Sequence, residues 1–353
     1  MKVDVLIIGQ GISGSFLAWN LLKLGVSVVV IDRPDPMAAS RVASGVINPV
    51  TGRTVVATWL IDELLPFCQA EYSQLGDGWG REVIRELPVT AFAHTEQMQQ
   101  AYEKRIAESY PYVHPLGQHG LDAFFNFTGA CYTISPAFLV DIHATLQITG
   151  KTIREKGQLR EESFNLDELV VSENKVGYKD CEADRVVFCN GTATFDYPFW
   201  KNIPYTSNKG EALLVSIPGL SANQLYKFGH LTLVPWQEGT WWVGSSFERD
   251  FKDVFPSESF RRSTENWLGM HLKLPFQVLD RLAGIRPSSI ERRPFVGWHP
   301  AQENVGILNG MGTKGCSLAP WFAAQLSNNI VNGRPIDPLA DVRRFSRIML
   351  SGA

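Results

Sequence analysis

The stretch from Val3 to Asp32, VDVLIIGQGISGSFLAWNLLKLGVSVVVID, decides the fold. Its first apolar run is short and rich in β-branched residues, which is typical of a parallel strand buried on both faces. A glycine-rich turn follows, then an amphipathic helix that ends near Gly25 and a second strand that ends at Asp32. This order of strand, turn, helix and strand predicts a dinucleotide-binding unit.

Three glycines of this stretch, Gly9, Gly11 and Gly14, form the pattern GxGxxG. The first permits a tight turn, the second lets the backbone approach a pyrophosphate, and the third lets the helix pack closely on the strand. The helix begins at Ile12 and Ser13, and its free N–H groups and positive dipole end would face the phosphates. We therefore expect all five residues to bind the dinucleotide.

Asp32 lies 23 residues after the first glycine of the pattern, at the end of the second strand. A carboxylate at this position accepts hydrogen bonds from ribose hydroxyls and repels a 2′-phosphate. NADP is therefore the least favoured dinucleotide, and this stretch leaves both FAD and NAD open.

The whole chain has 353 residues, of which 44% are hydrophobic, and it carries a formal net charge of −3. This length predicts one large domain or two interleaved domains around a sizeable core. The near balance of acidic and basic residues gives no reason to expect a nucleic acid or an anionic membrane as partner. The sequence leaves the oligomeric state open.

The five cysteines are scattered, with no CxxC pair and no histidine pair at metal spacing. This pattern predicts reduced thiols in a cytoplasmic enzyme and no metal site. No run reaches the roughly 18 to 20 apolar residues that span a bilayer, and the apolar run at Val3 is too soon interrupted by glycine to be a cleavable signal. We expect no membrane segment.

Blocks of helical and strand-like periodicity alternate along the rest of the chain. The segment from Thr54 to Gly76 reads as a helix, and VVFCNG reads as a second buried strand that ends at Gly191. We expect an α/β fold, in which a Rossmann-like cofactor domain interleaves with an α+β substrate domain built on an antiparallel sheet. The cofactor domain is assigned to residues 1–78, 132–207 and 280–353, and the substrate domain to residues 79–131 and 208–279.

Several motifs recur in a fixed order in a known family: GxGxxG, AASRVASGVINP, VVFCNG, LVPWQEGTWWVGSSFE, GIRPSS and GMGTKGCSLAP. In these motifs the chain resembles FAD-dependent oxidoreductases of the D-amino-acid oxidase, glycine oxidase and sarcosine oxidase type. The resemblance spans essentially the whole chain, although the segment 79–131 carries no recognised motif. Within the family, the run from Ser40 to Pro49 and VGSSFERD look closest to the flavin-oxidase half of the bifunctional enzyme that modifies tRNA wobble uridines.

The resemblance implies a set of further FAD contacts. In addition to the GxGxxG turn and Asp32, they are Arg33, Ser40, Arg41, Ser44, Gly45, Phe164, Gly191, Gly310, Gly312, Thr313, Lys314, Gly315 and Cys316. No cysteine lies between residues 286 and 310, where covalent-flavin relatives carry one, so non-covalent FAD is expected. Cys316 is expected to be a small buried residue.

The glycine-rich turn before the last helix also has a physical interpretation. Gly310, Gly312 and Gly315 let backbone amides converge at the helix N-terminus, beside Lys314. Reduced flavin carries negative charge, which such donors and a cation would stabilise. The alternative for Lys314 is an ordinary surface lysine.

Arg286 matches the arginine that binds the substrate carboxylate in amino-acid oxidases of this family. A planar guanidinium fits a carboxylate with two parallel hydrogen bonds, and the alternative is a structural salt bridge. Arg53 is a second candidate for the same cavity. Relatives often have an acid after the arginine motif, whereas this chain has Glu291, Arg292 and Arg293, so its substrate pocket differs from theirs.

The expected substrate sheet carries four ring side chains that are candidates for the core or for the walls of an amine pocket, but not for catalysis: Tyr226, His230, Trp236 and Trp242. The resemblance implies oxidation of a C–N bond of an amino acid or secondary amine, by hydride transfer to flavin N5 and with oxygen or another acceptor. The alternatives are a flavin enzyme acting on a modified nucleoside or hydroxy acid, and an NAD-dependent dehydrogenase.

Overall fold

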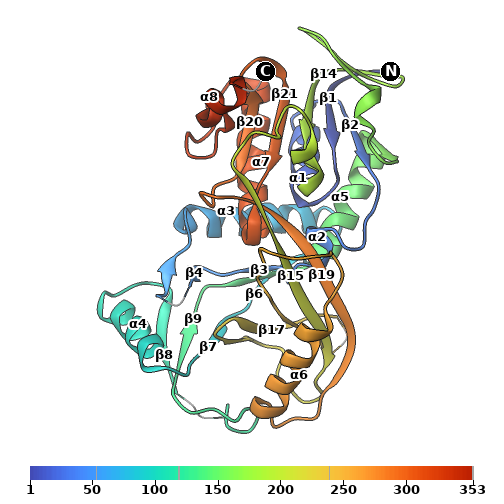
Figure 1. Ribbon diagram of the computed structural model, residues 1–353. Coiled ribbons are helices and arrows are strands. Elements are labelled where there is room, and N and C mark those ends of the chain that lie inside the picture. Colours follow the sequence, from blue (N-terminus) through green and yellow to red (C-terminus); the bar gives the residue numbers. More distant parts are fainter. Residues whose placement is uncertain (53, 118–119, 238, 352–353) are drawn as a thin grey trace.

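The computed structural model describes residues 1–52, 54–117, 120–237 and 239–351. Two sheets of eight strands each form the two halves of the molecule, and helices surround the upper one (Figure 1). The α-helices are α1 Ile12–Lys23, α2 Ala39–Val42, α3 Ile61–Asp77, α4 Glu96–Ala107, α5 Ile142–Lys156, α6 Glu258–His271, α7 Gly315–Asn332 and α8 Ser346–Leu350. Short 3-10 helices are η1 Leu166–Glu168, η2 Gly191–Asp196, η3 Gly312–Lys314 and η4 Val342–Phe345.

The first sheet has the order β11-β2-β1-β14-β13-β12, with β21 also paired to β14 and β20 paired to β21. Its strands are β1 Lys2–Ile8, β2 Val28–Asp32, β11 Gln158–Glu161, β12 Leu169–Val171, β13 Val176–Tyr178, β14 Cys181–Phe188, β20 Phe295–His299 and β21 Gln302–Asn309. The pairs β11–β2, β2–β1, β1–β14 and β14–β21 are parallel. The strand, turn, helix and strand of the opening stretch are therefore β1, α1 and β2.

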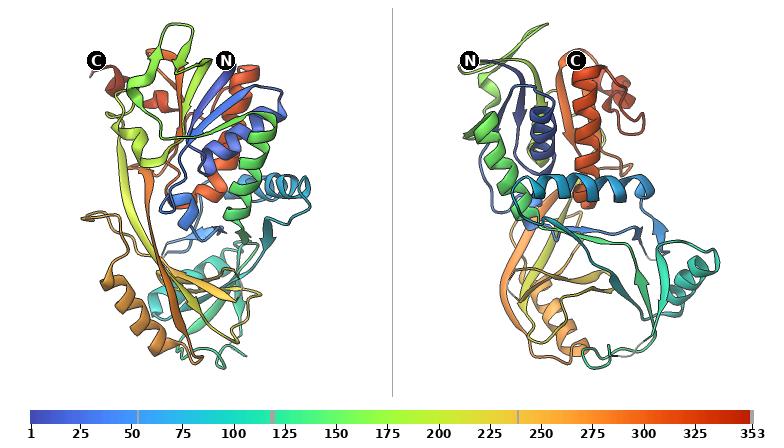
Figure 2. Two further views of the ribbon diagram at one scale, coloured as in Figure 1. Left: turned by 90° about the vertical axis from the view of Figure 1, so that its right-hand side faces the viewer. Right: turned by 180° about the vertical axis from the view of Figure 1, so that it is seen from behind.

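This first sheet is buried on both faces. Val5 and Ile7 of β1 face a core that includes residues of α1, α5 and α7, whereas Leu6 and Ile8 face a second core on the other side. Figure 2 shows α1, α5 and α7 side by side against the sheet. Burial on both faces explains why the strand sequences are continuous apolar runs rather than alternating ones.

The second sheet has the order β19-β15-β18-β17-β16-β7-β9-β8. Its strands are β7 Val89–Ala93, β8 Val113–Leu116, β9 Ala130–Ile134, β15 Tyr205–Ser216, β16 Leu225–Phe228, β17 Leu231–Pro235, β18 Thr240–Gly244 and β19 Gln277–Ser289. The pairing is antiparallel except that β16 runs parallel to β7. The remaining strands are β3 Val46–Ile47, β6 Ile84–Glu86 and β10 Phe138–Val140, which form one small sheet, and the pair β4 Val50–Thr51 and β5 Val56–Ala57.

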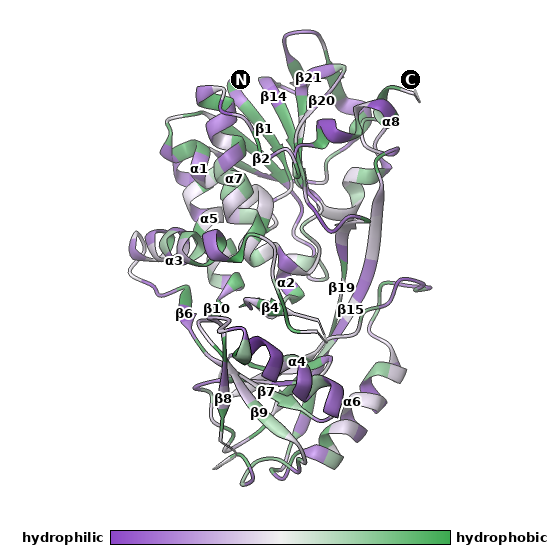
Figure 3. Ribbon diagram, turned by 90° about the vertical axis from the view of Figure 1, so that its left-hand side faces the viewer, coloured by the Kyte–Doolittle hydropathy of each residue, from purple (hydrophilic) through white to green (hydrophobic). Residues whose placement is uncertain are grey.

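The two faces of the second sheet have different neighbours. On the outer face, side chains such as Tyr226 and Phe228 form a core with α6, which contains both hydrophilic and hydrophobic residues (Figure 3). On the other face, Ala212 and Trp242 belong to the same core as α1 and α7. We call this second face, which carries Ala212 and Trp242, the inner face.

The long strands β15 and β19 reach from the second sheet to the first (Figure 1). The boundaries predicted at 207/208 and 279/280 fall inside these strands, and the division into two domains stays a prediction. No helix of the described part of the chain is both long and apolar enough to cross a bilayer.

The helix predicted over Thr54–Gly76 is wrong at its N-terminal end. Helix α3 begins only at Ile61, because Val56–Ala57 is a strand paired with Val50–Thr51 and Leu60 adopts a left-handed conformation with φ of 57°. A left-handed leucine is incompatible with a helix that continues through it. From Leu64 onward, the spacing of the apolar residues predicted the helix correctly.

Helix α1 packs against the turn at Gly9 through Gly14. A Cβ on Gly14 would lie 1.9 Å from the carbonyl oxygen of Gly9. We predict that Gly14→Ala separates α1 from β1, lowers the free energy of unfolding by about 2–4 kcal/mol and abolishes FAD binding. Urea unfolding and the flavin absorbance of the purified protein measure both effects. Gly269→Ala is the control, since nothing lies within 4 Å of a Cβ added there; a Gly14→Ala variant as stable as this control contradicts the prediction.

Candidate active site

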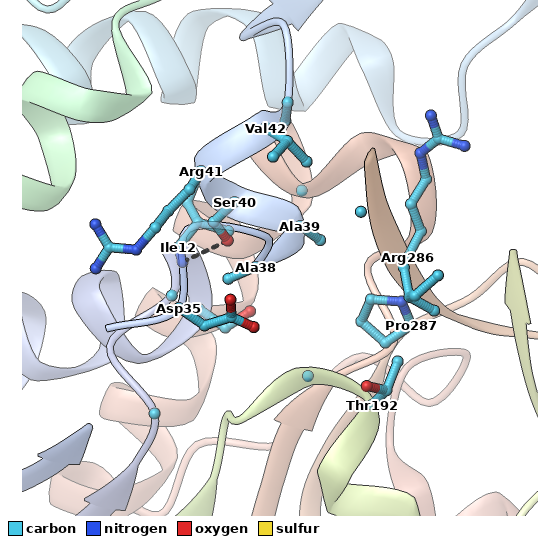
Figure 4. Close-up of a pocket in the computed structure, with 18 of the residues that line it drawn as sticks. Ile12, Asp35, Ala38, Ala39, Ser40, Arg41, Val42, Thr192, Arg286 and Pro287 are labelled. Atoms are coloured by element: carbon cyan, nitrogen blue, oxygen red, sulfur yellow. Dashed lines mark hydrogen bonds between the residues drawn. The ribbon is translucent and has the colours of Figure 1, made fainter. Parts of the chain in front are cut away.

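A cavity of about 660 Å³ extends from the carboxyl ends of β1 and β2 to the inner face of the second sheet. Ligand sites in proteins typically have this size. Figure 4 shows part of it, with Asp35 and Ser40 on one side and Arg286 and Pro287 on the other. The residues predicted from the sequence that line it are Gly9, Gly11, Ile12, Ser13, Asp32, Arg33, Ser40, Arg41, Ser44, Gly45, Phe164, Gly191, Arg286, Gly312, Thr313, Gly315 and Cys316.

Three of the predicted residues that the structure describes, Gly14, Gly310 and Lys314, do not line this cavity. Gly14 and Gly310 lie behind its wall, where each fits closely against a neighbour: a Cβ on Gly310 would lie 2.6 Å from the ring of Phe295. Lys314 lies beside the lining residues but is not one of them. Arg53 is outside the described residues, so its role stays a prediction.

The glycine-rich turn offers free backbone donors to the cavity. The amide of Ile12 donates to Ser40 Oγ at 3.0 Å, which ties helix α1 to α2 (Figure 4). The amides of Gly11 and Ser13 have no hydrogen-bond partner among the described residues, as expected in the first turn of a helix. Both residues line the cavity, so the turn can bind an anion through its N–H groups and helix dipole.

Asp32 lines the same end of the cavity, and one of its oxygens accepts a hydrogen bond from the amide of Gln10 at 2.9 Å. Burial raises the pKa of the Asp32 carboxyl, although the Gln10 amide and Arg41 act in the opposite direction. The second oxygen is free to accept from a ribose hydroxyl. Nearby, Glu162 also lines the cavity and its Oε1 is buried without a partner among the described residues.

The loop after β2 has a structural requirement as well as a place in the cavity wall. Gly45 has φ of 85°, and a Cβ on it would lie 2.1 Å from the carbonyl oxygen of Val140. Only glycine allows this close approach of the loop to β10. Cys316 on the opposite wall is buried, and burial raises the pKa of its thiol to about 12, so the thiol is protonated at neutral pH.

At the other end of the cavity, Arg286 projects from β19 on the inner face. Its Nη1 donates to Oδ1 of Asn208 at 2.8 Å and to the carbonyl oxygen of Ser246 at 3.2 Å. Its Nε and Nη2 have no partner, and the guanidinium has no acidic partner, among the described residues. Burial lowers the pKa of Arg286 to about 10, and the group remains charged at neutral pH. The structural salt bridge considered from the sequence is therefore absent from the described residues.

Gly210 makes this position of Arg286 possible. A Cβ on Gly210 would lie 1.8 Å from Nη2 of Arg286, so the guanidinium lies flat across the glycine backbone of β15. Neither Gly210 nor Asn208 was identified from the sequence. Their only signal is the alternation of β15 opposite β19, where Asn208 pairs with Arg286 and Gly210 with Gly284.

Lys314 caps helix α7 and is half-buried. Burial, together with the positive charges of Arg293 and Arg292, lowers the pKa of Lys314 to about 8. It makes no ion pair with a described acid, so it is not the ordinary solvated lysine of the alternative interpretation. Its contact with reduced flavin stays a prediction.

The four ring side chains named from the sequence lie in different parts of the structure. Trp242 lines the main cavity and donates from Nε1 to the carbonyl oxygen of Val42 at 3.0 Å. Trp236 lines a second cavity of about 300 Å³. Tyr226 lies in the outer core against α6, in agreement with the core interpretation, and His230 is exposed in the β16–β17 turn.

The described residues fit FAD. One end of the cavity has a carboxylate with a free oxygen, the middle has unpaired amides at a helix N-terminus, and the far end lies between Trp242 and the turn that contains Thr313. These groups match a ribose, a pyrophosphate and a ring system in that order. Their order along one continuous cavity is that of an extended dinucleotide.

The comparisons with known proteins agree with this geometry. The model of the family described as FAD dependent oxidoreductase matches residues 4–328. The chain belongs to this FAD-dependent oxidoreductase family.

Relatives of this chain include a glycine oxidase of Pseudomonas aeruginosa, 23% identical over 97% of both chains. A glycine oxidase of Bacillus subtilis is 26% identical over 43% of this chain and 42% of its own. Among solved structures, glycine oxidase from Bacillus cereus has a TM-score of 0.80 at 18% identity and covers 95% of this chain and 96% of its own. L-proline dehydrogenase from P. horikoshii has a TM-score of 0.78 at 16% identity, with 98% of both chains covered.

Family membership confirms the predicted fold class and the prediction of an FAD-dependent enzyme of the amino-acid oxidase type. The cofactor is FAD, bound without a covalent link. The NAD-dependent alternative is thereby excluded.

We predict that Lys314→Met raises the free energy of unfolding at pH 7, measured at a fixed FAD concentration, by about 1 kcal/mol. The reason is that folding disfavours the charged form of Lys314, whose pKa falls from 10.5 to about 8. As pH rises from about 8 to 10.5, Lys314 loses its proton and the cost of its charge in the folded state disappears. The difference in the free energy of unfolding between Lys314→Met and wild type therefore shrinks across this pH range. Lys201→Met, at an exposed lysine, is the control. The prediction is contradicted if Lys314→Met does not raise the free energy of unfolding, or if the increase does not depend on pH.

Proposed function

We propose that this enzyme oxidises the C–N bond of an amino acid or secondary amine that carries a carboxylate. The observation that carries the proposal is the guanidinium of Arg286, which lies at the far end of the FAD cavity with two donor groups and no acidic partner among the described residues. A half-buried cation without a counter-ion is held at a cost in free energy. A substrate carboxylate would remove that cost by forming charge-assisted hydrogen bonds.

The chain's own residues would bind and orient the substrate. FAD supplies the acceptor for the hydride and its electron pair. Arg286 would hold the carboxylate, and its fixed position across Gly210 would present the carbon next to the nitrogen to the cofactor. The walls around it, Ala212, Trp242 and Leu282, are mostly apolar and would exclude water from the reacting atoms.

Relatives support this substrate class by their names. Besides the glycine oxidases, similar solved structures include an iminodiacetate oxidase from Chelativorans, with a TM-score of 0.77 and 19% identity. Those proteins are described as acting on amino acids or related amines that carry a carboxylate. At these identities the structures show the fold, and the assignment of the substrate class rests on Arg286.

Arg286→Ala should leave FAD bound but reduce the rate of flavin bleaching by carboxylate substrates about 100-fold at low substrate concentration. Anaerobic mixing with a panel of amino acids and amines, followed at the flavin absorption bands, measures this rate and also identifies the substrate. Arg281→Ala is the matched control, because Arg281 lies on the same strand but is exposed. Unchanged kinetics in Arg286→Ala would remove this residue from the site.

Asn208→Asp should raise KM for a carboxylate substrate about tenfold with a smaller change in kcat. The change keeps the shape of the side chain but puts a negative charge 2.8 Å from Arg286, where it competes with the substrate. Steady-state kinetics measure the effect, and Asn223→Asp in an exposed turn is the control. Equal KM values for wild type and Asn208→Asp would contradict the proposal that the uncompensated guanidinium of Arg286 binds the substrate carboxylate.

A further inference from the structure

A second cation, Lys227 of β16, lies on the same face of the second sheet as Arg286. One row of directly paired residues crosses the sheet from β16 to β19. Its members, in order, are Lys227, Thr232, Gly244, Ala212 and Leu282. Residues paired directly across neighbouring strands point to the same face. Ala212 and Leu282 line the FAD cavity, so Lys227 projects from the inner face.

The core clusters give the same result independently of the pairing. The neighbours of Lys227, Tyr226 and Phe228, belong to the outer core against α6. Leu225, two residues before Lys227, belongs to the core that contains Trp242. Since side chains alternate along a strand, Lys227 points away from α6 and toward the half that holds FAD.

Lys227 has no partner for its charge. Its ammonium makes no hydrogen bond and no ion pair with any described residue. Its side chain is half-buried, and burial lowers the pKa of Lys227. Removing a charge even partly from water without a partner costs free energy, so an unpaired lysine facing the cofactor half requires an explanation other than stability.

The arrangement of the two cations suggests what they bind. The guanidinium of Arg286 crosses β15 at Gly210 and reaches the carbonyl oxygen of Ser246, which places it on the side of Lys227. Three strand spacings separate β15 from β16, or about 14 Å across a flat sheet, and the lysine side chain shortens this gap. The residues paired in the row between them, Thr232, Gly244 and Ala212, are small. The ring of Trp242, on the same face, lies against Gly244. Two positive groups therefore flank a stretch of sheet lined by small residues and one tryptophan ring.

We propose that Lys227 is a second anion-binding residue of the substrate site, and that the substrate carries a second anionic group besides the carboxylate bound by Arg286. This inference rests on the proposed function. The second group is a carboxylate or a phosphonate or phosphate, since an ammonium binds each of them by charge and hydrogen bonding. Lys227 would thus select doubly anionic amines over simple ones.

The experiment compares acids of equal chain length that bind without being oxidised. The FAD-bound enzyme is titrated with butyrate and succinate, then with hexanoate and adipate, and the dissociation constants are taken from the change in the flavin absorption spectrum. In at least one of the two pairs, we expect wild type to bind the diacid at least about tenfold tighter than the monoacid of the same chain length. Titration with 3-phosphonopropionate shows which anion is preferred: tighter binding than succinate indicates a phosphonate or phosphate, and weaker binding a carboxylate.

Lys227→Met should abolish the preference for diacids and leave the monoacid constants unchanged, whereas Lys227→Arg should retain it. Lys252→Met, at an exposed lysine of the same half, should behave as wild type. The inference is overturned if wild type shows no preference, or if Lys227→Met weakens monoacids and diacids equally. It is also overturned if this variant changes only the rate of flavin reduction at saturating substrate, which would indicate a proton acceptor.

Arg286→Ala distinguishes failure of this inference from failure of the proposed function. If the carboxylate anchor is correct, this variant loses affinity for monoacids as well as diacids. If monoacids bind Arg286→Ala as they bind wild type, the anchor is wrong, whatever the result for Lys227→Met.

Discussion

The pairing of β15 with β19 is the interaction on which the rest of the structure depends. It runs from Tyr205 opposite Ser289 to Ser216 opposite Gln277, with a shift in register only near its far end. Both strands belong to the second sheet and reach the first, so their backbone hydrogen bonds connect the half that contains the first sheet to the half that carries Arg286. A ladder of this length fixes the relative position of the two halves more firmly than a flexible linker would.

The same ladder determines the electrostatics of the site. Gly210 and Asn208 on β15 receive the side chain of Arg286 from β19, and Asn208 is a neutral acceptor. A carboxylate there would satisfy the guanidinium within the protein. With an amide, the positive charge remains available in a surrounding of low polarity, where its interaction with a ligand is strong. The absence of a described acidic partner for either Arg286 or Lys227 is thus consistent with a site whose anions come from outside the chain.

Much of the cofactor site could be predicted from the sequence, because it is built from a local unit. The glycine pattern, α1 and Asp32 lie within 32 residues, and the spacing of strand, turn and helix requires them to meet. The loop after β2 and the turn before α7 were found through resemblance, and most of their predicted residues line the cavity. Gly14, Gly310 and Lys314 lie outside the described cavity lining. Gly14 and Gly310 instead pack closely against Gly9 and Phe295, and such contacts cannot be read from a glycine pattern.

The sequence by itself determined the parallel sheet, a dinucleotide as cofactor and the position of the carboxyl ends of β1 and β2, because these follow from short-range patterns of apolar residues and glycine. The choice of FAD over NAD came from the resemblance of motifs along the whole chain. Only the tertiary structure decided what faces the substrate. Arg286, Asn208 and Lys227 lie on three strands whose register is set by pairing between distant segments, and a shift of one residue would turn each side chain to the opposite face. Tyr226 and Lys227 are adjacent in the sequence, yet one packs against α6 and the other faces the FAD half.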